Sequence, residues 1–207
     1  MQPKTEEILM QRVHNLYGMT ISELAQALKI SVPYDIKWAK GFAGQLIEIA
    51  LGATAGSNPV QDFPTLGIEL KTIPITLNCS PAETTHVCTL HTDCSGQTFE
   101  QSNFLNKIKK VLWVPIEGDK SIQLKDRHIG EGFLWEISPV DYQNLKIDWE
   151  EIMEIVCLGE VNKLSAHVGT WMQVRPEGYL NGQKQYGFYL RKQFTQNILN
   201  NHFKPTC

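Results

Sequence analysis

Three residues in the first half of the chain have types and a spacing that suit phosphate chemistry. In QDFPTLGIELKTIPI, residues 61–75, Asp62 precedes Glu69 and Lys71 within an otherwise apolar run. Residues two apart on a strand share a face, so Glu69 and Lys71 would project together, and Asp62 could fold back beside them. Two carboxylates and an ammonium group would then converge.

Such a group of side chains could bind a divalent cation and hydrolyse a phosphodiester. Mg²⁺ prefers oxygen ligands, from one or two carboxylates completed by water and substrate phosphate. The cation would act as a Lewis acid on the phosphoryl oxygens, and Lys71 could orient or deprotonate the attacking water. The alternative is a surface ion pair on an edge strand, worth about 0–1 kcal/mol. Glu48, in the apolar segment just upstream, could join the site or lie on the exposed face of a helix.

The residues before this segment predict three helices. Their expected bounds are 5–18, 20–30 and 41–53. The second opens with Thr20 and Glu23, a capping-box pair in which each side chain bonds the other's backbone N–H. The third has an apolar stripe that Gly52 could close. We therefore expect a helical region ahead of the first strand.

The second of these helices resembles the first half of a helix-turn-helix. The residues that follow it contain a proline and two glycines where a continuous basic recognition helix would be needed. This favours a small helical subdomain over DNA reading by this element. Its packing residues would be Leu24, Ala27, Leu28 and Ile30.

The middle of the chain changes to a period of two, which is typical of strands. Strands are expected at 66–75, 85–91, 110–118, 132–138, 170–176 and 186–194, and further helices at 146–159 and 194–203. The order of elements indicates a mixed α/β domain with helices first and a central sheet. We expect residues 1–207 to form one domain, in which two lobes are possible.

Composition excludes several classes of protein. A chain of 207 residues with 42% hydrophobic content can bury a sizeable core. The amino terminus carries acids where a signal peptide would be basic and then apolar, and no apolar run is long enough to span a bilayer, so we expect a cytoplasmic protein. The five cysteines are odd in number and scattered, which argues against a disulfide framework or a zinc site. Free thiols are expected.

The net charge of −3 is unevenly distributed along the chain. Residues 131–160 hold one base and eight acids, whereas residues 161–207 hold six bases and one acid. Residues 104–130 add a further excess of three positive charges. The asymmetry fits a protein with one phosphate-facing surface, although chance partition of solvated helices would give the same sums.

A longer segment carries a resemblance to a known family. Residues 40–75, KGFAGQLIEIALGATAGSNPVQDFPTLGIELKTIPI, closely resemble the MutH family of DNA mismatch repair endonucleases, which belongs to the restriction-endonuclease-like superfamily with a D…(D/E)-x-K motif. The resemblance continues through ETTHVC, KIKKVLWVPIEG, DWEEIMEIVCLGE and GFYLRKQFT, and so covers nearly the whole chain. It implies a restriction-endonuclease-like α/β fold, with a central mixed sheet flanked by helices and two lobes around a DNA-binding cleft.

The resemblance implies roles for the residues at matching positions. The metal ligands would be Asp62, Glu69 and, as a plausible extra ligand, the carbonyl of Leu70. Lys71 would be the catalytic lysine. Glu48 and Lys107 would assist, by positioning water or by balancing charge on the scissile phosphate. The cofactor would be Mg²⁺, for which Mn²⁺ or Ca²⁺ could substitute in binding.

DNA contacts are implied at four further positions. Arg175 could read guanine bidentately, and Tyr189 could sense whether adenine carries a methyl group. Lys40 and Lys192 would contact phosphates. The alternatives are a phosphate clamp for Arg175, a core aromatic for Tyr189 and solvated side chains for the two lysines.

Three features depart from the family pattern and bear on base reading. A phenylalanine is expected where His86 stands, and a lysine where Glu177 stands. The connection across residues 176–186 is also shorter than the family's. We expect Glu177 to repel phosphate. None of the three departures touches the expected metal site.

Members of this family nick the unmethylated strand 5′ of the guanine in hemimethylated GATC, when activated by MutL after MutS finds a mismatch. The resemblance therefore implies a monomeric enzyme whose partners are double-stranded DNA with GATC sites, MutL and, indirectly, MutS, with no membrane partner. One alternative is a GATC-specific restriction endonuclease that cuts both strands. The other is a non-catalytic DNA-binding or scaffold module, against which the complete Asp62, Glu69 and Lys71 set argues.

Overall fold

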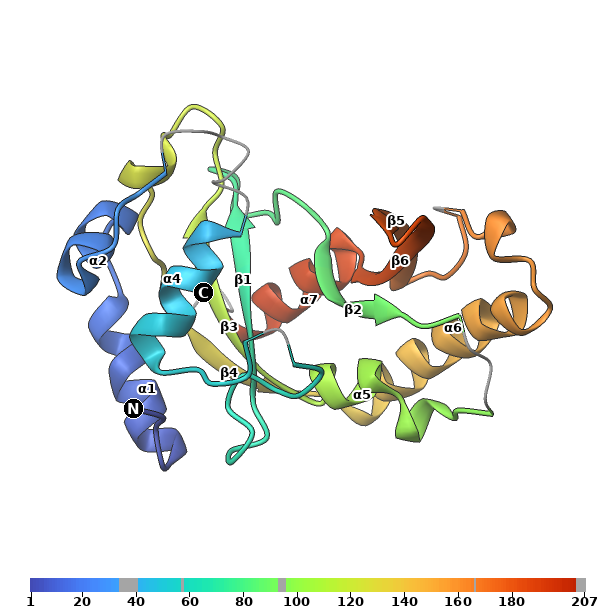
Figure 1. Ribbon diagram of the computed structural model, residues 1–207. Coiled ribbons are helices and arrows are strands. Elements are labelled where there is room, and N and C mark those ends of the chain that lie inside the picture. Colours follow the sequence, from blue (N-terminus) through green and yellow to red (C-terminus); the bar gives the residue numbers. More distant parts are fainter. Residues whose placement is uncertain (34–40, 57, 93–95, 166, 204–207) are drawn as a thin grey trace. The chain divides into compact units, whose positions relative to one another are not determined.

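The computed structural model of the chain describes residues 1–33, 41–56, 58–92, 96–165 and 167–203 (Figure 1). The chain divides into two compact units, Met1–Glu83 with Lys110–Trp135 and Thr84–Lys109 with Glu136–Cys207. The mixed α/β class is confirmed. In the described residues the strands form two three-stranded sheets, one in each unit, where one central sheet was expected.

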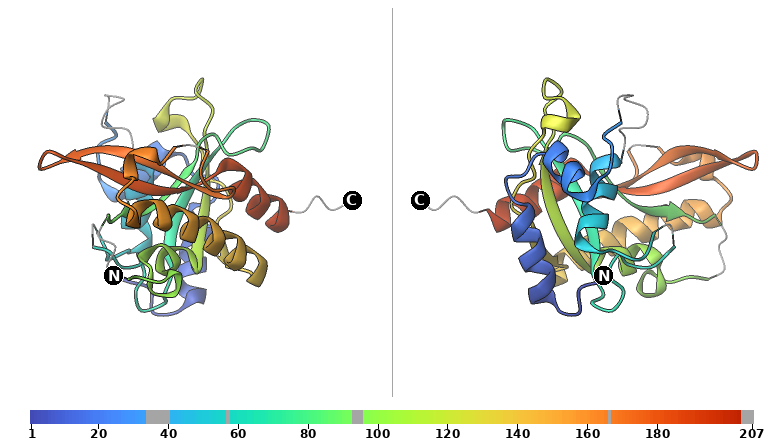
Figure 2. Two further views of the ribbon diagram at one scale, coloured as in Figure 1. Left: turned by 90° about the vertical axis from the view of Figure 1, so that its right-hand side faces the viewer. Right: turned by 60° about the vertical axis from the view of Figure 1, so that its left-hand side comes forward.

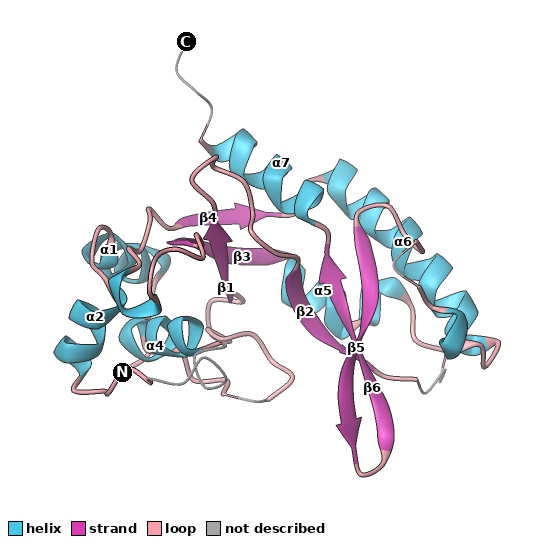
Figure 3. Ribbon diagram, turned by 90° about the horizontal axis from the view of Figure 1, so that it is seen from above, coloured by secondary structure: helices cyan, strands magenta, loops and turns pink. Residues whose placement is uncertain are grey.

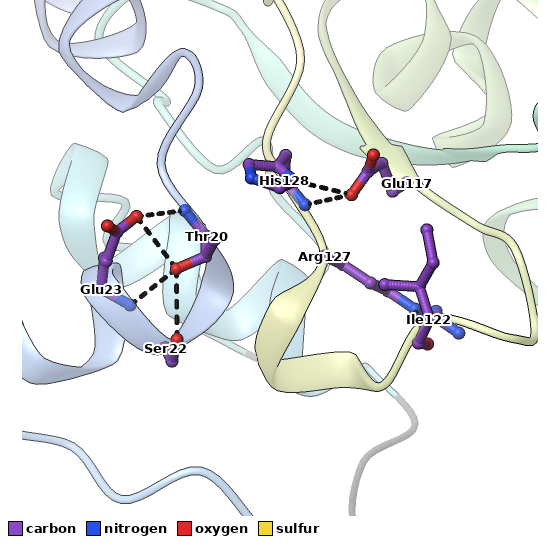
Figure 4. Close-up of polar contacts among 7 residues, drawn as sticks. All are labelled: Thr20, Ser22, Glu23, Glu117, Ile122, Arg127 and His128. Atoms are coloured by element: carbon purple, nitrogen blue, oxygen red, sulfur yellow. Dashed lines mark hydrogen bonds and ion pairs between the residues drawn. The ribbon is translucent and has the colours of Figure 1, made fainter.

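The first unit begins with the helices α1 (Glu6–Leu16), α2 (Ile21–Leu28) and α4 (Phe42–Leu51). All three were predicted, and the capping box of α2 is confirmed. The Thr20 hydroxyl accepts from the Glu23 N–H at 3.2 Å, and the Thr20 N–H donates to the Glu23 carboxylate at 2.7 Å (Figure 4). The N-terminal end of α2 is thus set by residues that the sequence displays.

One detail of the predicted helical packing is wrong. Leu24 is buried, and Leu28 and Ile30 are partly buried against the core, but Ala27 is exposed. The buried side of α2 includes Ile21, Leu24 and Ala25. That helical spacing turns Ala27 to the outer face.

The first sheet has the order β1-β3-β4. Its strands are β1 (Glu69–Ile75), β3 (Lys110–Glu117) and β4 (Phe133–Glu136). Strand β1 runs parallel to β3, with Glu69 opposite Val111. Every residue from Val111 to Ile116 is buried, as expected for a parallel strand covered on both faces. Figure 1 shows α4 beside β1, and Gly44 of this helix lies against Thr72 of the strand.

The segment after β3 is tied back to that strand. The Glu117 N–H donates to the His128 carbonyl at 3.0 Å, and the Glu117 carboxylate accepts from the His128 N–H at 2.8 Å. The His128 ring nitrogen Nδ1 lies 2.8 Å from the same carboxylate oxygen (Figure 4). These hydrogen bonds from His128 hold the pKa of Glu117 below its usual value.

The second sheet is antiparallel and has the order β2-β6-β5. Its strands are β2 (Thr85–Leu90), β5 (Met172–Leu180) and β6 (Gln183–Leu190). Figure 2 shows β5 and β6 as one long twisted ribbon. They are joined by Asn181 and Gly182, whose φ angles are 51° and 79°. Asn-Gly is the pair that favours a two-residue hairpin turn with both φ positive, so the short connection across 176–186 is a tight hairpin.

Among its described residues, the second unit also contains the α-helices α5 (Asn103–Ile108), α6 (Pro139–Cys157) and α7 (Lys192–His202) (Figure 3). Helix α6 packs against β5, and α5 packs against β2. The aromatic side chains Phe99, Phe104, Trp149 and Phe188 are buried in this unit. Phe104 meets Phe188 of the sheet edge to face, with 5.4 Å between ring centroids.

Several predicted boundaries in the second unit are wrong. Helix α6 begins at Pro139, well before residue 146, because Ser138 caps it by accepting from the Asp141 N–H at 3.1 Å. The expected strand 186–194 ends at Leu190, and Lys192 already belongs to α7. Helix α5 was not predicted, since six residues are too few to display a helical period.

The cysteines and the helices of the described residues bear on two expectations from composition. Cys79, Cys88 and Cys157 are free thiols, as expected. In the part of the chain that the structure describes, every helix is too short or too polar to cross a membrane.

Candidate functional site

A tight loop brings Asp62 back to the start of β1. Phe63 and Ile68 exchange two backbone hydrogen bonds, with N to O distances of 2.9 and 3.3 Å. This antiparallel bridge places Asp62 next to Glu69, because the residues flanking a bridged pair also face each other. The Asp62 carboxylate then accepts a hydrogen bond from the Leu70 N–H at 2.9 Å.

Glu69 and Lys71 meet on one face of β1, as their spacing predicted. The Lys71 ammonium nitrogen lies 2.8 Å from a carboxylate oxygen of Glu69. The Glu69 side chain is only 3% exposed and that of Lys71 16%, and Asp62 is buried. The structure thus brings together Asp62, Glu69 and Lys71.

The cluster has the donor set of a hard-cation site. A buried carboxylate is costly unless it is paired or hydrogen-bonded. Lys71 offsets one of the two negative charges, and the Leu70 N–H donates to the other. The formal charge of Asp62, Glu69 and Lys71 together is negative, so a divalent cation would be attracted. Carboxylate and carbonyl oxygens from Asp62, Glu69 and Leu70 are the ligand types that Mg²⁺ accepts.

The site formed by Asp62 and Glu69 differs from a metal site in which the protein supplies all the ligands. Among the described residues, no group of three or more His, Cys, Asp or Glu side chains could hold a metal ion. Two carboxylates suffice for Mg²⁺ when water and substrate phosphate complete its coordination. The residues present therefore fit a cation that binds together with a phosphate substrate.

Glu48 lies on α4, the helix that packs against β1. A Cβ atom on Gly44 would be 3.8 Å from the Thr72 hydroxyl oxygen, so this side of the helix faces the strand. Residues four apart on a helix share a side. Glu48 accordingly lies on the side of α4 that approaches β1, and it is half-buried.

Lys107 belongs to the other unit, in the last turn of α5. It is 9% exposed and so counts among the buried charged residues of the chain. Lysine is almost never fully buried unless its charge is paired. The helix that carries it is capped by Ser102, which accepts from the Leu105 N–H at 3.0 Å.

Arg175 and Tyr189 lie together on one face of the second sheet. The guanidinium carbon of Arg175 is 5.7 Å from the centroid of the Tyr189 ring, a cation–π distance. Arg175 also donates to the Thr84 hydroxyl oxygen at 3.1 Å. Lys192, the first residue of α7, is exposed, and Lys40 lies outside the described residues.

Glu177 and His86 belong to the same cluster, which sequence reasoning missed. A single Glu177 carboxylate oxygen accepts from the Tyr189 hydroxyl at 2.9 Å and lies 2.9 Å from the His86 Nε2. The sequence marked both residues only as departures from a family pattern. Their contact depends on the register that sets His86 opposite Tyr189, and the sequence does not display that register.

A cavity elsewhere in the first unit contains none of the expected site residues. Its volume is about 530 Å³, and it lies beside Ile75 and Glu117, at the ends of β1 and β3 away from Glu69. The lining is mostly apolar, with Glu117, Asp119, His128 and Tyr17 as its charged or titratable members. The buried carboxylates therefore lie outside this cavity.

Comparison with known proteins identifies the family. A family profile described as "DNA mismatch repair enzyme MutH" matches residues 51–148, a stretch that includes Asp62, Glu69, Lys71 and Lys107. The chain is 45% identical over 215 residues to the DNA mismatch repair protein MutH of Actinobacillus pleuropneumoniae serotype 5b, covering 97% of this chain and 95% of that protein.

Two more relatives match at similar identity. The DNA mismatch repair proteins MutH of Shewanella baltica strain OS185 and of Vibrio cholerae serotype O1 are each 44% identical over 216 residues. These matches cover 97% of this chain, with 97% and 98% of the respective relatives. The chain belongs to the MutH family of DNA mismatch repair enzymes.

Proposed function

We propose that this protein is a Mg²⁺-dependent endonuclease of mismatch repair that nicks the unmethylated strand at hemimethylated GATC sites when MutL activates it. The observation that carries the proposal is the convergence of buried Asp62 and Glu69 with Lys71 at the start of β1, in a chain that belongs to a family of mismatch repair enzymes. The whole chain would act as one endonuclease domain and as a monomer, in the cytoplasm, where it would meet DNA.

In this proposal the residues of the first unit perform the hydrolysis. Asp62, Glu69 and the Leu70 carbonyl would hold the cation, which supplies Lewis-acid stabilisation of the phosphoryl oxygens when bound. Lys71 would orient the attacking water in line with the scissile bond, and in its neutral amine form it would accept the proton of that water. Glu48, on the side of α4 that faces β1, would help to position that water.

Residues of the second unit would read the DNA and bind its backbone. Arg175 would donate two hydrogen bonds to guanine, and Tyr189 would lie where a methyl group on adenine adds bulk. Lys192 and Lys40 would contact phosphates, which fix register without carrying sequence information. Lys107 would balance charge on the scissile phosphate. The excess of bases over acids in residues 161–207 supports a phosphate-facing role for this part of the chain.

Two alternative functions differ from this one in the number of DNA strands that are cut. A restriction endonuclease with the same specificity would cut both strands, and a scaffold module would cut neither. Family membership supports the mismatch repair function, and a monomer with one Asp62, Glu69 and Lys71 set would reach one scissile phosphate at a time.

A plasmid assay tests the proposal. Supercoiled plasmid carrying one hemimethylated GATC is incubated with the protein and Mg²⁺, with and without MutL, beside a plasmid in which the site is altered. We expect relaxed circles that depend on the site, on Mg²⁺ and on MutL. Linear product would indicate a double-strand cutter, and unchanged supercoiled plasmid in the presence of MutL would indicate a non-catalytic module.

A further inference from the structure

We propose that Glu177 is a positioning residue for Tyr189, and that the carboxylate it places between Tyr189 and His86 sets how strongly the protein discriminates against methylated adenine. The inference rests on the proposed function, in which Tyr189 senses the methyl group. It assigns the selectivity to a hydrogen-bonded unit of three side chains in place of a lone tyrosine.

The three side chains come from three adjacent strands of one sheet. His86 on β2 is the direct cross-strand neighbour of Tyr189 on β6, and Glu177 reaches across from β5. Glu177 Oε1 accepts from the Tyr189 hydroxyl and lies within hydrogen-bonding distance of His86 Nε2, both at 2.9 Å. A carboxylate that bridges two donors on separate strands fixes both of them relative to the sheet.

Gly187 makes room for this carboxylate. A Cβ atom at this position would lie 2.1 Å from Glu177 Oε1 and 2.5 Å from its carboxyl carbon. Gly187 is two residues before Tyr189, so both belong to the same face of β6. The Glu177 carboxylate therefore lies directly over Gly187, in space that the Cβ atom of any other residue would fill.

The ring of Tyr189 is held from several directions at once. Its hydroxyl is bound by Glu177, the His86 ring lies against it at a centroid distance of 5.1 Å and an interplanar angle of 63°, and Arg175 lies over it at 5.7 Å. A ring that can swing aside would admit an added methyl group at little cost. A ring held in place makes the methyl group clash, which is how an interface rejects a slightly larger partner.

The carboxylate also links the two residues that the resemblance marks as departures from the family pattern. Phenylalanine in place of His86 would remove one donor from Glu177, and lysine in place of Glu177 would remove the acceptor from both Tyr189 and His86. His86 and Glu177 are therefore complementary, because each supplies a hydrogen-bonding partner to the other. This is the expected behaviour of residues that act as one hydrogen-bonded unit.

The test measures the ratio of nicking rates on hemimethylated and fully methylated GATC duplexes under single-turnover conditions. We expect Glu177→Ala to lower this ratio about three- to tenfold, the factor that corresponds to about one lost hydrogen bond. Gly187→Ala, which displaces the carboxylate but keeps all three polar side chains, should do the same. Glu177→Gln retains an acceptor and should restore most of the ratio. Gln183→Ala, on the same hairpin, is the control and should leave the ratio unchanged.

A double-mutant cycle shows whether Glu177 acts through the hydroxyl. Tyr189→Phe should reproduce the effect of Glu177→Ala, and the double variant should show no additional loss. Additive losses, or a wild-type ratio in both Glu177→Ala and Gly187→Ala, would overturn the positioning role. If Tyr189→Ala lowers the ratio while those two variants keep it, the proposed function stands and only this inference fails. If Tyr189→Ala has no effect, methyl sensing lies elsewhere, and both this inference and the proposed role of Tyr189 fail.

Discussion

The ammonium group of Lys71 lies 2.8 Å from a carboxylate oxygen of Glu69, two residues earlier on the same strand. Both side chains are largely buried, so the pair is ordered before any substrate arrives. In an exposed pair, the entropy lost in ordering two mobile side chains would offset most of the Coulomb attraction. A lysine fixed beside a carboxylate that would bind a cation is well placed to act on the attacking water.

Replacement of Lys71 by alanine should therefore abolish nicking and spare DNA binding. We expect a loss of at least about 100-fold in the single-turnover rate, the usual contribution of a positioned acid–base or electrostatic group. Binding would be followed by fluorescence anisotropy with Ca²⁺ in place of Mg²⁺. Lys120→Ala, at an exposed lysine of the same unit, is the matched control. Nicking retained in Lys71→Ala would remove this lysine from the mechanism.

Asp62 should couple cation binding to the stability of the first unit. Asp62→Asn keeps an oxygen that can accept from the Leu70 N–H but removes a charge from the ligand set. A cation at 100 times its Kd stabilises the protein that binds it by about 2.7 kcal/mol, so Mg²⁺ should raise the Tm of wild type and fail to do so in the variant. Asp126→Asn, at an exposed acid of the same unit, should retain the shift. An equal shift in Asp62→Asn would mean that Asp62 is purely structural.

Much of the fold could be predicted because its signals are local. The capping box at Thr20 and the glycine after Leu51 set helix ends within a few residues, and the alternation around Glu69 gave the face of β1. The start of α6 was missed although Ser138 and Pro139 form a local start signal, because the apolar period becomes clear only later. The division of the strands into two sheets depends on long-range pairing, which no local pattern records.

In the candidate site, too, some contacts follow from local sequence and others depend on long-range strand pairing. The contact between Glu69 and Lys71 follows from a spacing of two on a strand, and the return of Asp62 requires only the short loop between Phe63 and Ile68. The unit formed by Glu177, His86 and Tyr189 requires three strands in register. The resemblance to the family marked two of its members as departures from the family pattern, but their mutual contact is a property of the folded sheet.

Arg175 should carry sequence discrimination. Its guanidinium is held by the Thr84 hydroxyl at 3.1 Å and lies over the Tyr189 ring, which limits the orientations it can present to a base. Arg175→Lys keeps the charge but loses the planar fork that reads guanine. We expect the preference for GATC over a site with the guanine replaced to fall by about 1–3 kcal/mol. Uniform weakening on both sequences, with an unchanged salt dependence because lysine keeps the charge, would identify Arg175 as a phosphate contact.

Glu100 should make the second unit sensitive to acid. Its carboxylate accepts from the Lys146 ammonium at 2.6 Å and from the Tyr142 hydroxyl at 2.9 Å. The hydrogen bond from Lys146, followed by one from a backbone N–H and that from Tyr142, lowers the pKa of Glu100 from 4.5 to about 2. Because the folded state holds the proton less tightly than the unfolded state, the stabilisation is fully present above about pH 4.5 and is lost as the pH falls toward 2.

The difference in Tm between wild type and Glu100→Gln should therefore be largest above pH 4.5 and shrink as the pH falls toward 2. Glu100 is exposed and Lys146 is partly exposed, so about 1 M salt, where the Debye length is about 3 Å, should reduce the difference at neutral pH. Glu151→Gln, at an exposed acid on α6, controls for the loss of one negative charge. A Tm difference that stays constant from pH 6 to pH 2.5 would show that Glu100 stabilises the unit by packing. A contribution from the charge of the carboxylate would change across that range, whereas a contribution from packing would not.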